Sequence, residues 1–278
     1  MAELKKETME SGKKKLKSNS RRDFLAKSLV ASGIFIVPRH VLGGKGYLAP
    51  SDRLNLAAIG AGGKGRSDIM NASVKGRERV VALCDIHISG EHGVTDCRKA
   101  FPNATFYQDF REMLDKEKDI DAVTISTPDH THANAAIFAM ERGKHVYVQK
   151  PLTHNVREAR ILTEMARAQK VVTQMGNQGA SNPTQLEIQG WINSGKIGKI
   201  SEVKVWTNRP VWPQGIPWPE PQGDQKPSDL NWDLWLGPAK ETEYNPAMHP
   251  FNWRGWWDYG TGALGDMGCH LMDIPFKA

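Results

Sequence analysis

The 278-residue chain is 39% hydrophobic and 24% charged, a composition typical of soluble globular proteins, which argues against a disordered or fibrous one. Its formal charge of +6 comes from the first 43 residues, which hold ten Lys and Arg against four acids, so residues 44–278 carry 27 charges of each sign. A neutral body gives no electrostatic argument for binding nucleic acid.

The first 43 residues have the layout of an export signal. A lysine-rich stretch is followed by Arg21-Arg22 and by an apolar run from Ser28 to Val37, which is shorter than the roughly 20 residues that span a bilayer. Small residues at its end offer a cleavage site. We therefore predict that residues 1–43 are a twin-arginine signal peptide, that the twin-arginine machinery exports the protein to the periplasm or beyond, and that no stable membrane anchor remains. The alternative is an amphipathic helix that stays on the protein.

A glycine-rich pattern follows the leader. The apolar run "RLNLAAIGAGGKG" contains Gly60, Gly62 and Gly65, and a second run, "RVVALCD", ends in Asp85, 20 residues after Gly65. A strand, a glycine turn and a helix with an acid at this distance are typical of dinucleotide binding. Gly60 allows the tight turn, Gly62 lets the backbone approach the pyrophosphate, and Gly65 lets the helix pack closely. Asp85 would accept from the ribose hydroxyls and repel a 2′-phosphate, so we predict NAD and disfavour NADP. A glycine turn in an unrelated α/β protein is the alternative.

Strand-like and helix-like segments then alternate. "DIDAVTISTP" indicates a buried strand, "HANAAIFAMERG" a helix ended by Gly143, and "HVYVQ" a strand that cannot continue through Pro151. Asn155 and Glu158 form a capping-box pattern that begins "VREARILTEMARAQ", and "KVVTQM" indicates the next strand. The alternation predicts an α/β fold with a doubly wound parallel sheet over residues 52–176.

Lys150 stands at the carboxyl end of a buried strand, where its ammonium is costly to desolvate unless the charge is used. Ligands of doubly wound sheets bind beyond the carboxyl ends of the strands. Gly60, Asp85, Thr127 and Pro128 fall at the same edge. We therefore expect Lys150 to face the nucleotide cleft.

The cysteines are Cys84, Cys97 and Cys269, an odd and sparse set that makes no disulfide framework. With His87 and His92, the first two superficially form a zinc set. The spacing fits no standard zinc finger, and Cys84 ends a strand. We expect no metal site.

The segment "STPDHTHANAAIFAMERGKHVYVQKPLTHNVREAR", with the glycine fingerprint and "GALGDMGCHLMD", resembles the glucose-fructose oxidoreductase, inositol dehydrogenase and MocA (Gfo/Idh/MocA) family from about residue 52 to 276. The resemblance implies a Rossmann domain followed by an α/β substrate domain whose open sheet covers the cleft. The family's usual Glu-Lys-Pro stands here as Gln149-Lys150-Pro151. Besides Gly60, Gly62, Gly65 and Asp85, the expected cofactor-binding residues are Thr127, Pro128, His132 and Lys150.

The resemblance also places Lys150 in the active site with an Asp and a His spaced D-x-x-x-H, here Asp266 and His270. On a helix these two residues share a face. His270 is the expected base, Asp266 would orient it or hold a neighbouring hydroxyl, and Lys150 would stabilise a developing alkoxide. The plainer alternative is a helix cap and an ordinary buried histidine.

From Gln178 the composition changes. "ISEVKVWTN" alternates like a strand with one solvated face, and all nine tryptophans lie between Trp191 and Trp257. Core and loop packing is the commoner role of such a cluster; the candidates for stacking on sugar rings are Trp212, Trp218, Trp253 and Trp256. Because the family's second domain continues past the D-x-x-x-H helix, we expect residues 177–278 to be its truncated start, with an exposed edge strand.

These features predict an exported NAD-dependent oxidoreductase that acts on a secondary hydroxyl of a sugar, polyol or glycoside and carries its nucleotide tightly bound. A nucleotide that never leaves must be recycled, for instance by exchange between two substrates. The alternatives are an NAD-dependent glycoside hydrolase that oxidises, eliminates and re-reduces in one turnover, and a non-catalytic sugar-binding protein. We expect a homo-oligomer when full length; the sugar and the number of subunits stay open.

Overall fold

The structure, a computed structural model, describes residues 48–74, 77–90 and 92–277. The predicted signal peptide lies outside the described residues. The chain divides into two compact units, Met1–Asp52 and Arg53–Ala278. Of the first unit, the described part is residues 48–52, with a short 3-10 helix, η1 (Pro50–Asp52). The features below belong to the second unit.

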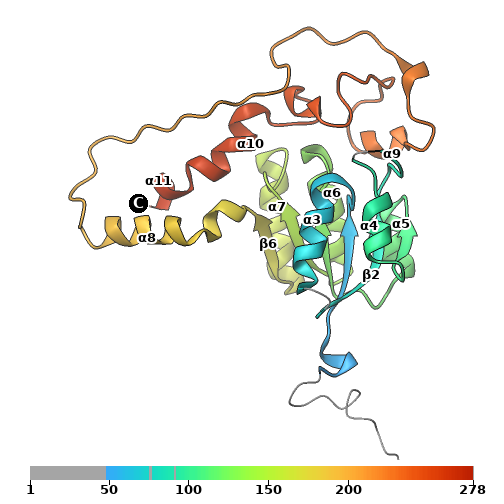
Figure 1. Cartoon of the computed structure of the whole chain (residues 1–278), viewed down its shortest axis with the longest axis horizontal. Coiled ribbons are helices and arrows are strands. Elements are labelled where there is room, and N and C mark those ends of the chain that lie inside the picture. Colours follow the sequence, from blue (N-terminus) through green and yellow to red (C-terminus); the bar gives the residue numbers. More distant parts are fainter. Residues whose placement is uncertain (1–47, 75–76, 91, 278) are drawn as a thin grey trace, which may run out of the picture. The chain divides into compact units, whose positions relative to one another are not determined.

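Six parallel strands form one sheet in the order β3-β2-β1-β4-β5-β6 (Figure 1). The strands are β1 (Asn55–Ile59), β2 (Arg79–Cys84), β3 (Thr105–Tyr107), β4 (Ala122–Ile125), β5 (His145–Gln149) and β6 (Thr173–Gly176). The helices between them are α3 (Gly63–Ala72), α4 (Thr95–Ala100), α5 (Phe110–Lys116), α6 (Asp129–Glu141) and α7 (Val156–Gln169). This strand order is that of the Rossmann fold, so the predicted doubly wound parallel sheet is confirmed.

Helices bury both faces of the sheet. In β1, Ala57 belongs to an apolar cluster with Met140 of α6, whereas its neighbour Ala58 belongs to a second cluster with Ile69 of α3. Successive side chains of a strand point to opposite faces. The strands therefore read as continuous apolar runs, as expected for a parallel sheet covered on both sides.

Local signals in the sequence set several element ends. The Asn155 side chain accepts from the Glu158 N–H, and the Glu158 carboxylate accepts from the Asn155 N–H, which confirms the capping box at the start of α7. Gly143, just after α6, has φ +71°, a conformation that glycine adopts without strain. The strand β5 ends at Gln149 and is followed by a cis Lys150–Pro151 peptide.

Residues 177–277 contain helices but no strand. The helices are η3 (Gln178–Ser181), α8 (Pro183–Asn193), η4 (Gly223–Gln225), α9 (Trp232–Leu236), η5 (Asn252–Gly255), α10 (Gly262–Leu271) and α11 (Asp273–Lys277). The predicted strand "ISEVKVWTN" is wrong: its Val203, Val205 and Trp206 are 53%, 44% and 80% exposed. Alternation favours a strand only where another strand pairs with its backbone, and none of the described residues does so.

An aromatic cluster packs the C-terminal segments together. Trp235, Trp253, Trp256 and Tyr259 are buried in it, and Trp232 stacks on Trp235 with ring centroids 4.5 Å apart and an interplanar angle of 10°. Four of the nine tryptophans therefore take part in packing, which is the commoner role of such a cluster. Among the described helices, none is long and apolar enough to cross a membrane.

Candidate active site

The glycine turn joins β1 to α3. Gly60 has φ +74°, and a Cβ on Gly60 would lie 2.8 Å from the carbonyl oxygen of Ser126. A Cβ on Gly65 would lie only 1.7 Å from the carbonyl oxygen of Gly60, so the first turn of α3 packs directly on the loop. Among the described residues, no side chain caps the N-terminus of α3, which leaves backbone donors and the positive end of the helix dipole for an anion.

Asp85 braces this turn from the end of β2. Its Oδ2 accepts from the Gly62 N–H at 2.7 Å and its Oδ1 from the His87 N–H at 3.0 Å. Burial raises the pKa of Asp85 to about 6, against the lowering effect of these backbone hydrogen bonds. At Gly62 the expected neighbour is the pyrophosphate of the nucleotide, but the group that lies there is the carbonyl oxygen of His92. A Cβ on Gly62 would lie 2.1 Å from this oxygen. In this structure the loop after β2 uses the space that the missing side chain leaves.

A cleft of about 1180 Å³ runs along the carboxyl edge of the sheet, from the glycine turn to Asp266 and His270 of α10. Most of the predicted site residues line it, namely Gly60, Gly62, Asp85, Thr127, Pro128, Lys150, Asp266 and His270. Gly65 lies beneath the turn, where its predicted role is helix packing. His132 does not line the cleft. The residue is 1% exposed, so its prediction as a direct cofactor contact is corrected: its two ring nitrogens lie 2.8 Å from backbone carbonyl oxygens instead.

Lys150 and Asp266 meet in the cleft. The Lys150 Nζ donates to Asp266 Oδ1 at 2.6 Å and to the Asp266 backbone oxygen at 3.0 Å. A second cation, Arg254, lies with its Nε 3.7 Å from the same Oδ1 and its guanidinium 4.3 Å from the ring centre of Trp253. Burial lowers the pKa of Arg254, partly against the charge of Asp266.

His270 follows Asp266 by one turn of α10 and lines the same part of the cleft. Burial lowers its pKa below the ordinary value of 6.5, the charge of Lys150 lowers it further, and Asp266 opposes both. The imidazole is therefore neutral at neutral pH and able to accept a proton. The described residues show no hydrogen bond between Asp266 and His270, so the predicted orientation of His270 by Asp266 does not hold here; Asp266 holds Lys150 instead.

Two polar contacts of the site were not predicted. Gln149 donates from its side-chain amide to Asp68 Oδ2 at 2.9 Å, and Ser126 donates to the same oxygen at 2.8 Å. Lys64 pairs with the other oxygen of Asp68. A glutamate at position 149 would face a buried carboxylate, so the amide suits this site. The departure from Glu-Lys-Pro was the signal in the sequence, but it did not reveal a partner 81 residues away.

The predicted aromatic candidates divide into two pairs. Trp212 and Trp253 line the cleft. Trp256 is buried in the aromatic cluster, and Trp218 lies against Tyr259 with ring centroids 6.1 Å apart. Trp212 and Trp253 are themselves only 3% and 6% exposed, so each offers a small surface to a bound ring.

Two family profiles match the chain. One, described as "Oxidoreductase family, NAD-binding Rossmann fold", matches residues 54–177, and the other, "Oxidoreductase family, C-terminal alpha/beta domain", matches residues 190–276. The chain belongs to the Gfo/Idh/MocA oxidoreductase family. The NAD-binding profile covers the whole sheet, the glycine turn and Lys150, and the second profile covers Asp266 and His270.

Curated relatives of this Gfo/Idh/MocA protein differ in the activities that their names state. It is 26% identical to levoglucosan dehydrogenase of Pseudarthrobacter phenanthrenivorans over 182 residues, 64% of this chain and 37% of the relative. It is 35% identical to scyllo-inositol 2-dehydrogenase (NAD(+)) of Bacillus subtilis over 100 residues, 36% of this chain and 29% of the relative. It is 31% identical to a glycosyl hydrolase family 109 protein of Solibacter usitatus over 160 residues, 55% of this chain and 36% of the relative. The matches span about a third of each relative's length.

Proposed function

We propose that this Gfo/Idh/MocA protein is an NAD-dependent oxidoreductase that acts on a secondary hydroxyl of a sugar, polyol or glycoside. The observation that carries the proposal is the meeting of Lys150, Asp266 and His270 in the cleft whose other end is the glycine turn. A cation, a carboxylate and a neutral imidazole together provide the groups that alcohol oxidation needs.

The residues of the turn fit a dinucleotide. The uncapped N-terminus of α3 offers backbone N–H groups to the pyrophosphate. Asp85 lines the cleft, and with a pKa of about 6 it is mostly ionised at neutral pH. An ionised carboxylate there accepts from ribose hydroxyls and repels a 2′-phosphate, which favours NAD over NADP.

Bound NAD would supply the hydride acceptor. His270 takes the hydroxyl proton of the substrate while hydride leaves the same carbon, which becomes a ketone. Lys150 stabilises the negative charge that develops on the oxygen. Asp266 holds the Lys150 ammonium in place through two hydrogen bonds. Its negative charge also offsets part of the positive charge of Lys150 and Arg254.

Export by the twin-arginine pathway is part of the proposal. Its support is the charge and hydrophobicity of residues 1–43, with Arg21-Arg22 ahead of a short apolar run. Because that pathway moves folded proteins, the nucleotide would travel tightly bound. A second substrate would then have to return the hydride before the next turnover.

A second candidate is a glycoside hydrolase that oxidises, eliminates and re-reduces within one turnover. The 31% identity to a glycosyl hydrolase family 109 protein favours it. Both candidates use the same first step, removal of a hydroxyl proton and a hydride, so the same three residues serve either one.

Product analysis separates the two candidates. The chain purified from the periplasm is analysed for released nucleotide by mass and absorbance, then incubated with sugars, polyols and p-nitrophenyl glycosides. An oxidoreductase forms a ketone and reduced nicotinamide, whereas a hydrolase releases p-nitrophenol with no net redox change. Bound nucleotide with neither product would contradict both, and a cytoplasmic location would contradict export alone.

A further inference from the structure

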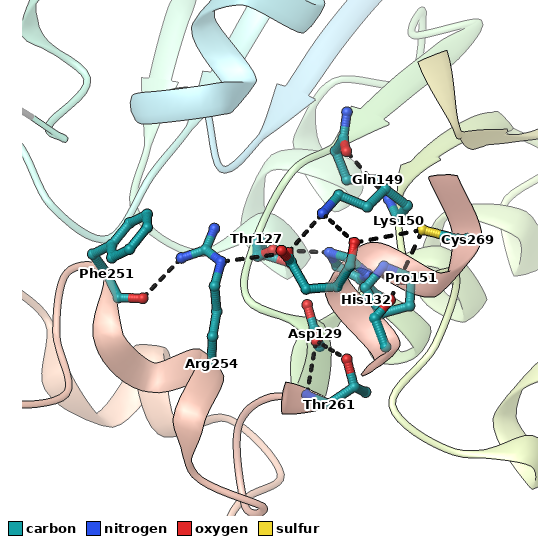
Figure 2. A network of polar contacts seen from close by, with 12 residues as sticks. Thr127, Asp129, His132, Gln149, Lys150, Pro151, Phe251, Arg254, Thr261 and Cys269 are labelled. Carbon is teal, nitrogen blue, oxygen red and sulfur yellow. Dashed lines mark hydrogen bonds and ion pairs between the residues drawn. The ribbon is translucent and has the colours of Figure 1, made fainter. Parts of the chain in front are cut away.

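His132 lies beneath the cleft with each ring nitrogen beside a backbone carbonyl. Its Nδ1 is 2.8 Å from the carbonyl oxygen of Pro151, and its Nε2 is 2.8 Å from the carbonyl oxygen of Thr127 (Figure 2). The side chain is 1% exposed, so water does not complete either contact. The ring joins the segment after β4 to the segment after β5.

The two contacts restrict the protonation of the ring. A carbonyl oxygen only accepts hydrogen bonds, and a neutral imidazole has one N–H donor and one acceptor nitrogen. A neutral His132 would therefore set a lone pair against a carbonyl oxygen at 2.8 Å inside the protein, which is costly. The imidazolium, with two N–H groups, satisfies both carbonyls.

A counter-charge lies on the same helix. Asp129, three residues earlier in α6, is buried, and its Oδ2 accepts from both the N–H and the hydroxyl of Thr261, at 3.1 and 2.9 Å. Burial raises the pKa of the Asp129 carboxyl, whereas a positive charge on His132 and the hydrogen bonds from Thr261 lower it. Thr261 directly precedes α10, so Asp129 is hydrogen-bonded to the start of the helix of Asp266 and His270.

We propose that His132 is a positioning residue, a doubly protonated imidazolium that fixes Lys150 relative to the nucleotide-binding edge. Its partner Pro151 is bonded directly to Lys150, and its partner Thr127 lines the cleft. The ring thus sets the distance between the lysine ammonium and the nucleotide without touching either. The effect on turnover rests on the proposed function, but the protonation of the ring does not.

NMR of the full chain labelled with ¹⁵N-histidine tests the protonation directly. At neutral pH, His132 should show two protonated ring nitrogens, assigned by the signals lost in His132→Gln. His145 is the internal control: its Nδ1 accepts from the Val172 N–H at 3.0 Å, so that nitrogen carries no proton and the ring should show one N–H. A His132 ring with one unprotonated nitrogen would overturn the inference.

Kinetics test the positioning. A glutamine at 132 offers donors to one carbonyl and leaves the other unpaired, so His132→Gln should lower kcat roughly tenfold to 100-fold, as small misplacements of catalytic groups do, with NAD affinity unchanged. His154→Gln is the matched control, since the described residues give the His154 side chain no hydrogen bond; its kcat should stay at the wild-type value. A folded His132→Gln with wild-type kcat would overturn the positioning role. An inactive wild type would contradict the proposed function and leave the NMR result decisive.

Discussion

Lys150 uses two of its three N–H groups on Asp266. One goes to Oδ1 at 2.6 Å and one to the backbone oxygen at 3.0 Å, although the residues are 116 positions apart. A lysine ammonium has three donors, and the described residues provide no partner for the third. The ammonium is therefore anchored on one side and has one N–H left for a substrate oxygen.

Replacing Lys150 should stop chemistry without releasing the cofactor. Lys150→Met removes the charge that stabilises the developing alkoxide, so kcat should fall by roughly 10² to 10³. Lys150→Arg should also fail, because a planar fork does not replace a compact ammonium. Steady-state rates and NAD binding by calorimetry measure both effects; normal turnover of Lys150→Met would show that the lysine is only a strand end.

The pKa of His270 should respond in opposite directions to its two charged neighbours. Lys150 lowers it and Asp266 raises it, so Lys150→Met should raise the pKa and Asp266→Asn should lower it. NMR follows the histidine signals across pH 4 to 9, a range that extends roughly two units or more to each side of the ordinary histidine pKa. This titration gives the pKa of His270 in both variants without needing activity. If His270 is the base, the acid limb of kcat/KM should lie at the same pKa; shifts of equal sign in the two variants would contradict the assigned contacts.

Asp85→Ala should weaken NAD binding and reduce discrimination against NADP. Each charge-assisted hydrogen bond to a ribose hydroxyl contributes about 1.5 to 3 kcal/mol. The same substitution frees the N–H groups of Gly62 and His87, so the stability of the nucleotide-free protein serves as the control. Unchanged affinity for NAD would show that the carboxylate only braces the turn.

Restoring the family's glutamate should harm this protein. Gln149→Glu replaces a hydrogen bond to Asp68 by two facing carboxylates, so the free energy of unfolding at pH 7 should fall by about 1 to 3 kcal/mol. Asp68→Asn in the same chain should recover part of the loss, since residues in contact are energetically coupled. Urea unfolding of the two single variants and the double variant measures the coupling; additive losses would mean that Gln149 and Asp68 do not interact.

Acid should destabilise the fold through two buried histidines. Burial lowers the pKa of His130 to about 4 and that of His249 to about 3, from 6.5. As pH falls from 6.5 toward 4, the unfolded chain takes up protons that the folded chain does not, so each histidine lowers the free energy of unfolding by at most about 1.4 kcal/mol per pH unit. Burial raises the pKa of Asp85 from 3.8 to about 6 in the folded chain. As pH falls between those two values, the folded chain takes up this proton before the unfolded chain does, so Asp85 increases the free energy of unfolding.

His249→Phe separates these contributions. The ring of His249 packs edge-on against Trp235, and the described residues give its side chain no hydrogen bond, so phenylalanine keeps the packing and removes the titration. The loss of stability between pH 6.5 and 4 should become smaller in this variant. An unchanged pH dependence would mean that His249 titrates normally in the folded chain.

The sequence alone predicts the Rossmann half of the fold because its signals are local. The turn at Gly60, the capping box at Asn155 and the apolar strands each depend on residues a few positions apart. The pairing of Lys150 with Asp266 followed only from the family resemblance. The contacts of Gln149 with Asp68 and of His132 with Pro151 join distant segments, and no periodicity in the sequence encodes them. The failed strand at "ISEVKVWTN" shows the same limit, because a strand depends on its partner.

The sheet is complete at Gly176, and this has a consequence for synthesis on the ribosome. All six strands and the glycine turn precede residues 177–278, and domains fold as units while the chain emerges. The nucleotide-recognising edge is therefore able to form while the helix α10 is still to be translated. The loop after β2 must wait longer, because the Ile86 carbonyl accepts from the N–H of Asn231. The nascent protein thus acquires the glycine turn and Lys150 ahead of Asp266 and His270.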